Sequence, residues 1–206
     1  KLARAEALLD MGREAEAADA AAPLVEMLAG GQQGDPDTIV NCVKASLIYL
    51  RVKGPANADG AEYRALMQEL GKVRTQIEPL SFGACLAEAQ LLYSKDNYAD
   101  AGKALDESLK LNPRNAETWE LLGMVMVNSL DLDNARRVAA RLDELAKPAL
   151  SPAGAMIRAK AAMRQSDWTL ARAALKPALA QYPEHRGLLA SLAAATAGTF
   201  DDAKIG

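Results

Sequence analysis

The chain of 206 residues has few of the side chains that usually hold metal ions or carry out redox chemistry. It contains one histidine, two cysteines and only 4% aromatic residues. Cys42 and Cys85 are far apart in the sequence, so they lack the paired spacing of a zinc site or a redox motif. We expect both to be small buried hydrophobic residues. The sequence therefore predicts no metal site and no cofactor.

Motifs of catalysis are also missing. His185 follows a proline at an expected helix start, where a surface position is the simplest interpretation. Gly30, Gly31 and Gly34 lack the Lys-Ser/Thr pair that completes a phosphate-binding loop. Cys85 has no motif that would supply a base to activate it. We predict that this segment contains no catalytic residue and is not an enzyme.

Charge and hydropathy exclude two further classes of protein. The net charge is −3 and the charges are spread evenly, whereas a nucleic-acid-binding surface needs a basic stripe. The chain has no run of 18 or more apolar residues, so we expect no membrane insertion. The composition fits a soluble protein of either the cytoplasm or the periplasm. The chain starts at Lys1 without a basic-then-apolar leader, and we expect it to be a piece of a longer protein.

What the sequence does contain is a repeat of about 34 residues. Large, small and proline positions return in the same order along the second half of the chain. A fixed period of this length indicates stacked helix pairs, in which each pair covers the apolar face of its neighbour. The large positions are Tyr98, Leu132 and Trp168, the small ones are Ala101, Ala135 and Ala171, and the prolines are Pro113 and Pro183.

These residues resemble the tetratricopeptide repeat (TPR) family. The stretch from Trp119 to Gly123, WELLG, matches the family's first helix. The resemblance implies an all-α fold, a right-handed superhelical solenoid of five to six antiparallel helix pairs. Second-helix positions are matched by Tyr98, Ala101, Leu105 and Pro113 in one repeat and by Trp168, Ala171, Leu175 and Pro183 in another.

The match is uneven along the chain. Residues 1–80 are expected to form longer, divergent TPR-like pairs, and residues 81–206 to form repeats closer to the family pattern. We expect a single continuous solenoid whose last repeat is incomplete, with a turn at Gly198 and Thr199 before a new helix at Phe200. The expected helices cover about 1–11, 13–28, 36–52, 58–77, 82–94, 98–111, 116–129, 132–146, 152–165, 168–181 and 184–197.

In the TPR family, the first helix of each pair lines a concave groove. The family's clamp of Lys, Asn and Arg for a terminal carboxylate is not reproduced here, which leaves an apolar strip with charges beside it. The methionines in this strip could instead be core residues, and Lys160 and Arg164 could be a solvated stripe. The resemblance places these residues in a peptide-binding groove: Leu86, Gln90, Tyr93, Glu120, Met124, Val127, Asn128, Met156, Lys160, Met163 and Arg164.

The predicted function is protein–protein interaction, as a scaffold or adaptor that binds a peptide or helix of another protein. Two other classes stay open at this stage. The segment could be structural and mediate self-association, or it could be the substrate-recruiting arm of a larger enzyme. The sequence itself does not identify the partner.

Overall fold

The computed structural model describes residues 1–30, 35–53 and 60–205, with side chains up to residue 199. In these ranges all regular structure is helical, and the chain divides into two compact units, 1–112 and 113–206. We call them the N-terminal and C-terminal units. Residues 82–111, which are closer to the family pattern, thus belong to the same compact unit as the divergent residues 1–80. The N-terminal unit comprises α1 (Leu2–Asp10), α2 (Glu14–Ala29), α3 (Pro36–Lys53), α4 (Ala61–Lys72), the π-helical turn η1 (Val73–Ile77), α5 (Phe82–Tyr93) and α6 (Tyr98–Leu111).

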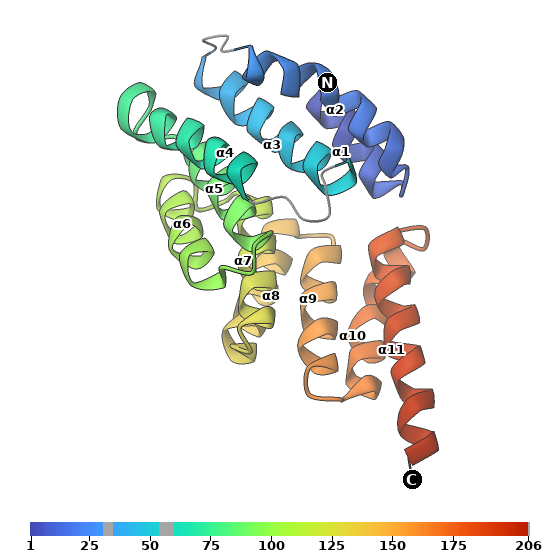
Figure 1. The fold of residues 1–206 in the computed structure, drawn as a ribbon. Coiled ribbons are helices and arrows are strands. Elements are labelled where there is room, and N and C mark those ends of the chain that lie inside the picture. Colours follow the sequence, from blue (N-terminus) through green and yellow to red (C-terminus); the bar gives the residue numbers. More distant parts are fainter. Residues whose placement is uncertain (31–34, 54–59, 206) are drawn as a thin grey trace. The chain divides into compact units, whose positions relative to one another are not determined.

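The C-terminal unit repeats one arrangement of antiparallel helices. Each helix packs on the next in the chain, and α7 also contacts α9, as α9 contacts α11. Figure 1 shows α9, α10 and α11 side by side. First helices α7, α9 and α11 therefore form one layer, with α8 and α10 as their second helices. The unit comprises α7 (Ala116–Asn128), α8 (Leu132–Ala146), α9 (Pro152–Met163), α10 (Trp168–Gln181) and α11 (Arg186–Ile205).

Capping side chains start the helices where the sequence predicts. In each case an oxygen of the cap residue accepts a hydrogen bond from a backbone N–H in the first turn, which is otherwise left without a partner. Asp35 does this at the start of α3. The caps of α5 to α10 are Ser81, Asn97, Asn115, Asp131, Ser151 and Asp167.

The first helices α1, α5, α7 and α9 all end in the same turn. Two or three positions after the last helical residue, the backbone takes a left-handed conformation, with φ from 57° to 69°, at Gly12, Asp96, Leu130 and Ser166. The next N–H bonds to a carbonyl five residues back, as from Asn97 to Leu92 at 3.0 Å. This is the Schellman pattern of helix ends. The pair α1–α2 therefore shares the turn of the regular repeats, although its sequence is divergent.

Glycines in the C-terminal unit lie where helices approach closely. A Cβ on Gly123 would lie 2.4 Å from Ile157 of α9, and one on Gly154 would lie 2.9 Å from the Ala139 carbonyl of α8. Both distances are below van der Waals contact, so a methyl group would force the Ile157 side chain or the α8 backbone to shift. Small residues at the equivalent second-helix positions, Ala101, Ala135 and Ala171, are fully buried, as the repeat pattern predicts.

One expectation about this unit was wrong. Gly198 does not make a turn, and α11 continues through it from Arg186 to Ile205. A Cβ at this position would lie 2.5 Å from the ring of Trp168, so the glycine makes room for the indole. The predicted break after residue 197 is therefore a close packing contact between α10 and α11.

Cys42 and Cys85 are buried free thiols, 3% and 2% exposed, in agreement with the sequence. Burial raises the pKa of both. The expected helix over 58–77 is interrupted, since α4 ends at Lys72 and gives way to the π turn η1. The predicted loop at 31–34 and the helix end at Gly54 and Pro55 lie outside the described residues.

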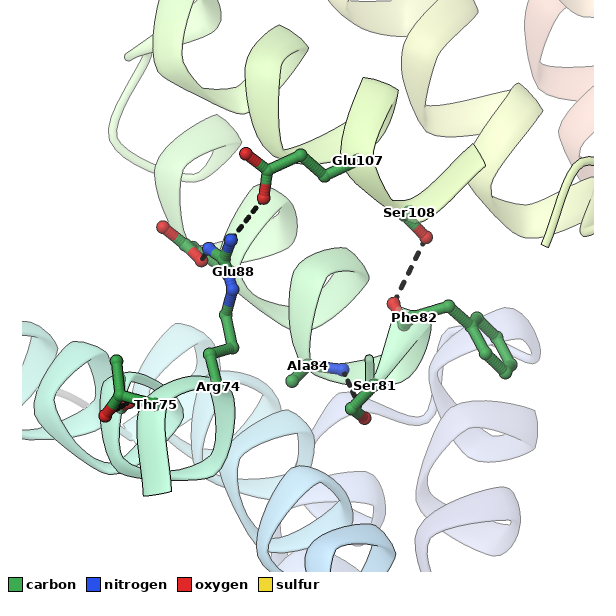
Figure 2. A network of polar contacts seen from close by, with 9 residues as sticks. Arg74, Thr75, Ser81, Phe82, Ala84, Glu88, Glu107 and Ser108 are labelled. Carbon is green, nitrogen blue, oxygen red and sulfur yellow. Dashed lines mark hydrogen bonds and ion pairs between the residues drawn. The ribbon is translucent and has the colours of Figure 1, made fainter. Parts of the chain in front are cut away.

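Arg74, on the π turn, joins three elements of the N-terminal unit (Figure 2). Its guanidinium forms ion pairs with Glu88 of α5 and with Glu107 of α6. Nearby, the Ser108 hydroxyl of α6 donates to the Phe82 carbonyl at the start of α5, at 3.1 Å. Arg74 and Glu88 are mostly shielded from solvent, which strengthens the bridge between the divergent segment and the α5–α6 pair.

Replacing Gly198 by alanine tests the packing at Trp168. Alanine favours an exposed helix by up to about 1 kcal/mol. At Gly198 the rigid indole blocks the new methyl group, so we expect destabilisation of about 1–3 kcal/mol, the range for overpacking. Gly102→Ala is the control, because a Cβ there meets nothing within 4 Å and should stabilise α6. Thermal unfolding measures both, and equal stabilisation by the two changes would contradict the packing role.

Replacing Arg74 by lysine tests the bridge. A single ammonium lacks the planar fork that serves two carboxylates at once. We therefore expect the free energy of unfolding, measured with urea, to fall by about 1–2 kcal/mol. Lys103→Met is the control, because the Lys103–Asp100 pair is well exposed and such pairs contribute little to stability. Equal losses would show that the bridge adds nothing beyond a surface pair.

Candidate functional site

The outer surface of α7 and α9 carries the candidate site. Positions spaced by four residues on a helix share one face, and here they are only partly buried or exposed. The set continues along both helices, so it forms a stripe on each. We call this surface the α7–α9 face and define it by Glu120, Met124 and Asn128 of α7 and Met156, Lys160 and Arg164 of α9.

Two polar contacts cross from α9 to α7. The Lys160 Nζ lies 3.5 Å from the Met124 Sδ. The Arg164 guanidinium donates to the Asn128 side-chain oxygen at 3.0 Å. Each contact joins residues 36 positions apart, and the second lies four residues further along both helices. The two helices therefore run in the same direction, with Glu120 toward their N-terminal ends.

Both cations of this face contact neutral acceptors. A thioether sulfur is a weak acceptor, and an amide oxygen carries no net charge. On the same helix, Arg158 instead pairs with the Asp143 carboxylate at 2.6 Å, and that carboxylate also accepts from the Ser151 N–H at 3.2 Å. Arg158 is therefore a structural cation with a carboxylate partner. In the described part of the chain, Lys160 and Arg164 have no such contact with a carboxylate.

The surroundings of Lys160 disfavour its charge. Burial lowers the pKa of the ammonium below the ordinary lysine value, the nearby Glu120 raises it, and Arg164 lowers it further. The net effect is a lowered pKa because burial is the largest cause. An ammonium that is partly removed from water and rests on sulfur costs folding free energy.

The methionines are intermediate between core and surface. Met156 and Met163 pack against the buried cluster of the C-terminal unit, yet both stay partly exposed. Met156 lies against α11, where a Cβ on Gly187 would be 2.8 Å from its sulfur. Met156 and Met163 are therefore neither fully buried core residues nor fully exposed ones, and their place in a binding groove stays a prediction.

Two of the predicted groove residues are not accessible. Leu86 is 1% exposed and Val127 is 2% exposed, so neither presents its side chain to a ligand. A first helix with neighbours on both sides keeps only a narrow outward stripe, and these residues fall outside it. Gln90 and Tyr93 of α5 are partly buried. They belong to the N-terminal unit, so the candidate site is drawn from the C-terminal unit alone.

We did not predict the role of His185 from the sequence. Its Nδ1 accepts a hydrogen bond from the Leu188 N–H at 3.2 Å and so caps α11. It is a partly buried capping residue rather than a plain surface one. The place of His185 at an expected helix start was the available signal, although Ser, Thr, Asp and Asn are the usual caps.

The described residues hold no group of three or more His, Cys, Asp or Glu placed to bind a metal ion. None of the described helices is both long and apolar enough to cross a membrane. The α7–α9 face itself offers two cations, an acid and apolar side chains. These groups can bind another molecule by contact and charge.

No protein-family model matches the chain, and no curated protein matches it in sequence. Solved structures do match. A thermophilic TPR protein of Thermus thermophilus is 16% identical, with a TM-score of 0.69 over 95% of this chain and 96% of that one. The chain has the TPR fold. PilF of Pseudomonas aeruginosa is 17% identical, with a TM-score of 0.51 over 93% of this chain and 86% of that one. At these identities the likeness to both structures concerns the fold alone.

Replacing Lys160 by methionine tests the cost of its charge. The folded protein has the lower pKa, so between that value and the ordinary lysine pKa the unfolded chain binds more protons, and stability rises with pH. Below this window the cost is fully present. We therefore expect Lys160→Met to be at least as stable as the original chain at neutral pH, with a difference that shrinks as the pH rises toward the ordinary value.

Arg158→Met is the matched control on the same helix. It leaves Asp143 without its cation and should destabilise the protein at neutral pH by about 1–3 kcal/mol. Urea unfolding between pH 7 and the alkaline limit of folding measures both variants. A Lys160→Met variant that is less stable than the original chain at every pH would show that the ammonium stabilises the fold.

Proposed function

We propose that the chain is a non-catalytic protein-interaction module that binds a short segment of another protein on the α7–α9 face. The TPR fold supports an interaction module in general, because stacked helix pairs present extended surfaces to partners. The observation that carries the finer proposal is the pair of cations, Lys160 and Arg164, whose contacts among the described residues are with the neutral acceptors Met124 and Asn128.

Charge defines one part of the ligand. Hydrogen bonds between a cation and a carboxylate are roughly twice as strong as neutral ones. A ligand carboxylate would replace the Met124 sulfur at Lys160 and the Asn128 oxygen at Arg164, and so exchange weak acceptors for strong ones. It would also neutralise an ammonium whose burial costs free energy. The favoured ligand therefore carries one or two acidic residues.

Apolar contact defines the other part. Met124, Met156 and Met163 offer partly exposed thioether side chains, which are flexible and polarizable and adapt to varied apolar partners. Their contact area supplies the hydrophobic component of binding, which the two cations alone would lack. The ligand should thus have leucine-like or aromatic anchors beside its acids.

The charges also orient the ligand. Exposed Glu117 and Glu120 lie toward the N-terminal ends of the parallel helices, while Arg164 lies toward the C-terminal end of α9. An acidic residue beside Glu120 would be repelled, and one beside Arg164 would be attracted. We infer that the acidic end of the ligand lies near Arg164 and that a neutral or basic end lies near Glu120.

A random peptide library selected on the whole chain tests this function. We expect enrichment of peptides with one or two Asp or Glu next to apolar anchors. Arg164→Glu should weaken the selected peptides by roughly tenfold, the effect of losing one charge-assisted hydrogen bond, and Glu120→Lys should strengthen them. Fluorescence anisotropy at two salt concentrations measures the affinities.

Lys176→Glu is the matched control, since Lys176 is exposed on α10 and off the α7–α9 face. It makes the same change of net charge and should leave affinity nearly unchanged. Selected peptides without acidic residues, or equal losses in Arg164→Glu and Lys176→Glu, would contradict binding at this face.

A further inference from the structure

The contact between Met124 and Lys160 places an oxidisable sulfur against an ammonium group. The chain has seven methionines, and in its described part Met124 is the one whose sulfur is in hydrogen-bond contact with a cation, 3.5 Å from the Lys160 Nζ. Met124 is only partly buried. The same ammonium is the group that an acidic ligand would use.

Oxidation changes what the sulfur offers to that ammonium. A thioether accepts hydrogen bonds weakly, whereas a sulfoxide is polar and carries an oxygen acceptor. With hydrogen peroxide, the sulfur lone pair attacks one peroxide oxygen and the O–O bond breaks. One oxygen stays on sulfur and the other leaves as water with both protons. Methionine loses two electrons and the peroxide gains them.

We propose that Met124 is a redox-sensitive modification site: peroxide converts it to a sulfoxide whose oxygen accepts a hydrogen bond from Lys160 and removes that ammonium from acidic ligands. The consequence for ligands rests on the proposed function, whereas the Met124–Lys160 bond of the oxidised protein does not. The sulfur already lies against the ammonium, so the new oxygen needs no movement of α7 or α9 to reach it.

Two effects of oxidation act in the same direction on binding. The sulfoxide supplies Lys160 with an intramolecular acceptor, so a ligand carboxylate has to displace a stronger contact than before. It also makes Met124 polar, and so removes one apolar contact from the α7–α9 face. Methionine sulfoxide reductases reverse the change, so the oxidised state is a reversible one.

Met11 provides the internal comparison. It is 48% exposed at the end of α1 and belongs to the other unit, so peroxide should oxidise it readily without any effect on Lys160. Met124→Leu keeps the volume and apolar character of the side chain but cannot be oxidised, and such swaps are well tolerated. Met11→Leu is its matched control.

The experiment treats the whole chain with hydrogen peroxide and locates sulfoxides by peptide mapping. Two readouts follow: the rate at which an N-hydroxysuccinimide acetate ester acetylates Lys160, and the affinity for a fluorescein-labelled peptide of alternating leucine and glutamate. Acetylation needs the neutral amine, so a hydrogen bond that stabilises the ammonium slows it. Circular dichroism confirms that the oxidised chain stays folded.

Oxidation of Met124 should slow Lys160 acetylation and weaken the labelled peptide, each by roughly tenfold, as expected of one hydrogen bond to a charged group. Methionine sulfoxide reductase should restore both. Met124→Leu should show neither effect, and Met11→Leu should behave like the original chain.

The outcomes separate the two proposals. Unchanged acetylation of Lys160 after complete oxidation of Met124, or no oxidation of Met124 when Met11 is fully oxidised, overturns the redox site. Slowed acetylation with a peptide that fails to bind even before oxidation supports the Met124–Lys160 bond and counts against the proposed function. If the peptide binds and its affinity is the same before and after oxidation, the proposed function is supported and the effect of oxidation on binding is overturned.

Discussion

Close approach of helices at glycine is the constraint on which the C-terminal unit depends. Gly123 admits Ile157, Gly154 admits the carbonyl of Ala139, and neither leaves room for a methyl group. These contacts determine where α9 lies between α7 and α8. They also fix the register in which Lys160 meets Met124 and Arg164 meets Asn128. The geometry of the candidate site thus depends on the close packing of the same helices.

Stability and binding make different demands on α9. Arg158 stabilises the fold, because it pairs with the Asp143 carboxylate, which also accepts a hydrogen bond from the Ser151 N–H at the start of α9. Lys160, two residues further on, is partly buried on the α7–α9 face, and this burial lowers the pKa of its ammonium. A residue that costs folding free energy at an accessible position is better explained by what it binds than by what it supports. One helix therefore carries a cation paired with a carboxylate, Arg158, and the cation to which we assign a ligand in our proposal, Lys160.

Local signals made most of the fold predictable from the sequence. Caps such as Asn97, Asp131 and Asp167 act within three residues, so the starts of the helices could be placed. Gly198 was misread because glycine serves both turns and close packing, and only the position of Trp168 distinguishes the two.

Partners distant in sequence explain the other misses. The ion pair of Arg74 with Glu107 spans 33 residues and has no local signature. In the candidate site, the resemblance to the TPR family placed Glu120, Met124 and Asn128 on one face of α7, and all three are partly buried or exposed. The same reasoning included Val127, which is buried. The side of a helix that remains open depends on both neighbouring helices, and helical periodicity alone does not show how wide that side is.

The left-handed residue that ends α1, α5, α7 and α9 shows how little a turn can depend on its own sequence. Glycine adopts this conformation freely, whereas a leucine such as Leu130 does so at a cost of about 1 kcal/mol. The turn persists with Gly12, Asp96, Leu130 or Ser166 because the helices on either side impose it. Residue identity at such positions is free to drift over evolution, and a repeat architecture can outlast the sequence pattern by which it is recognised.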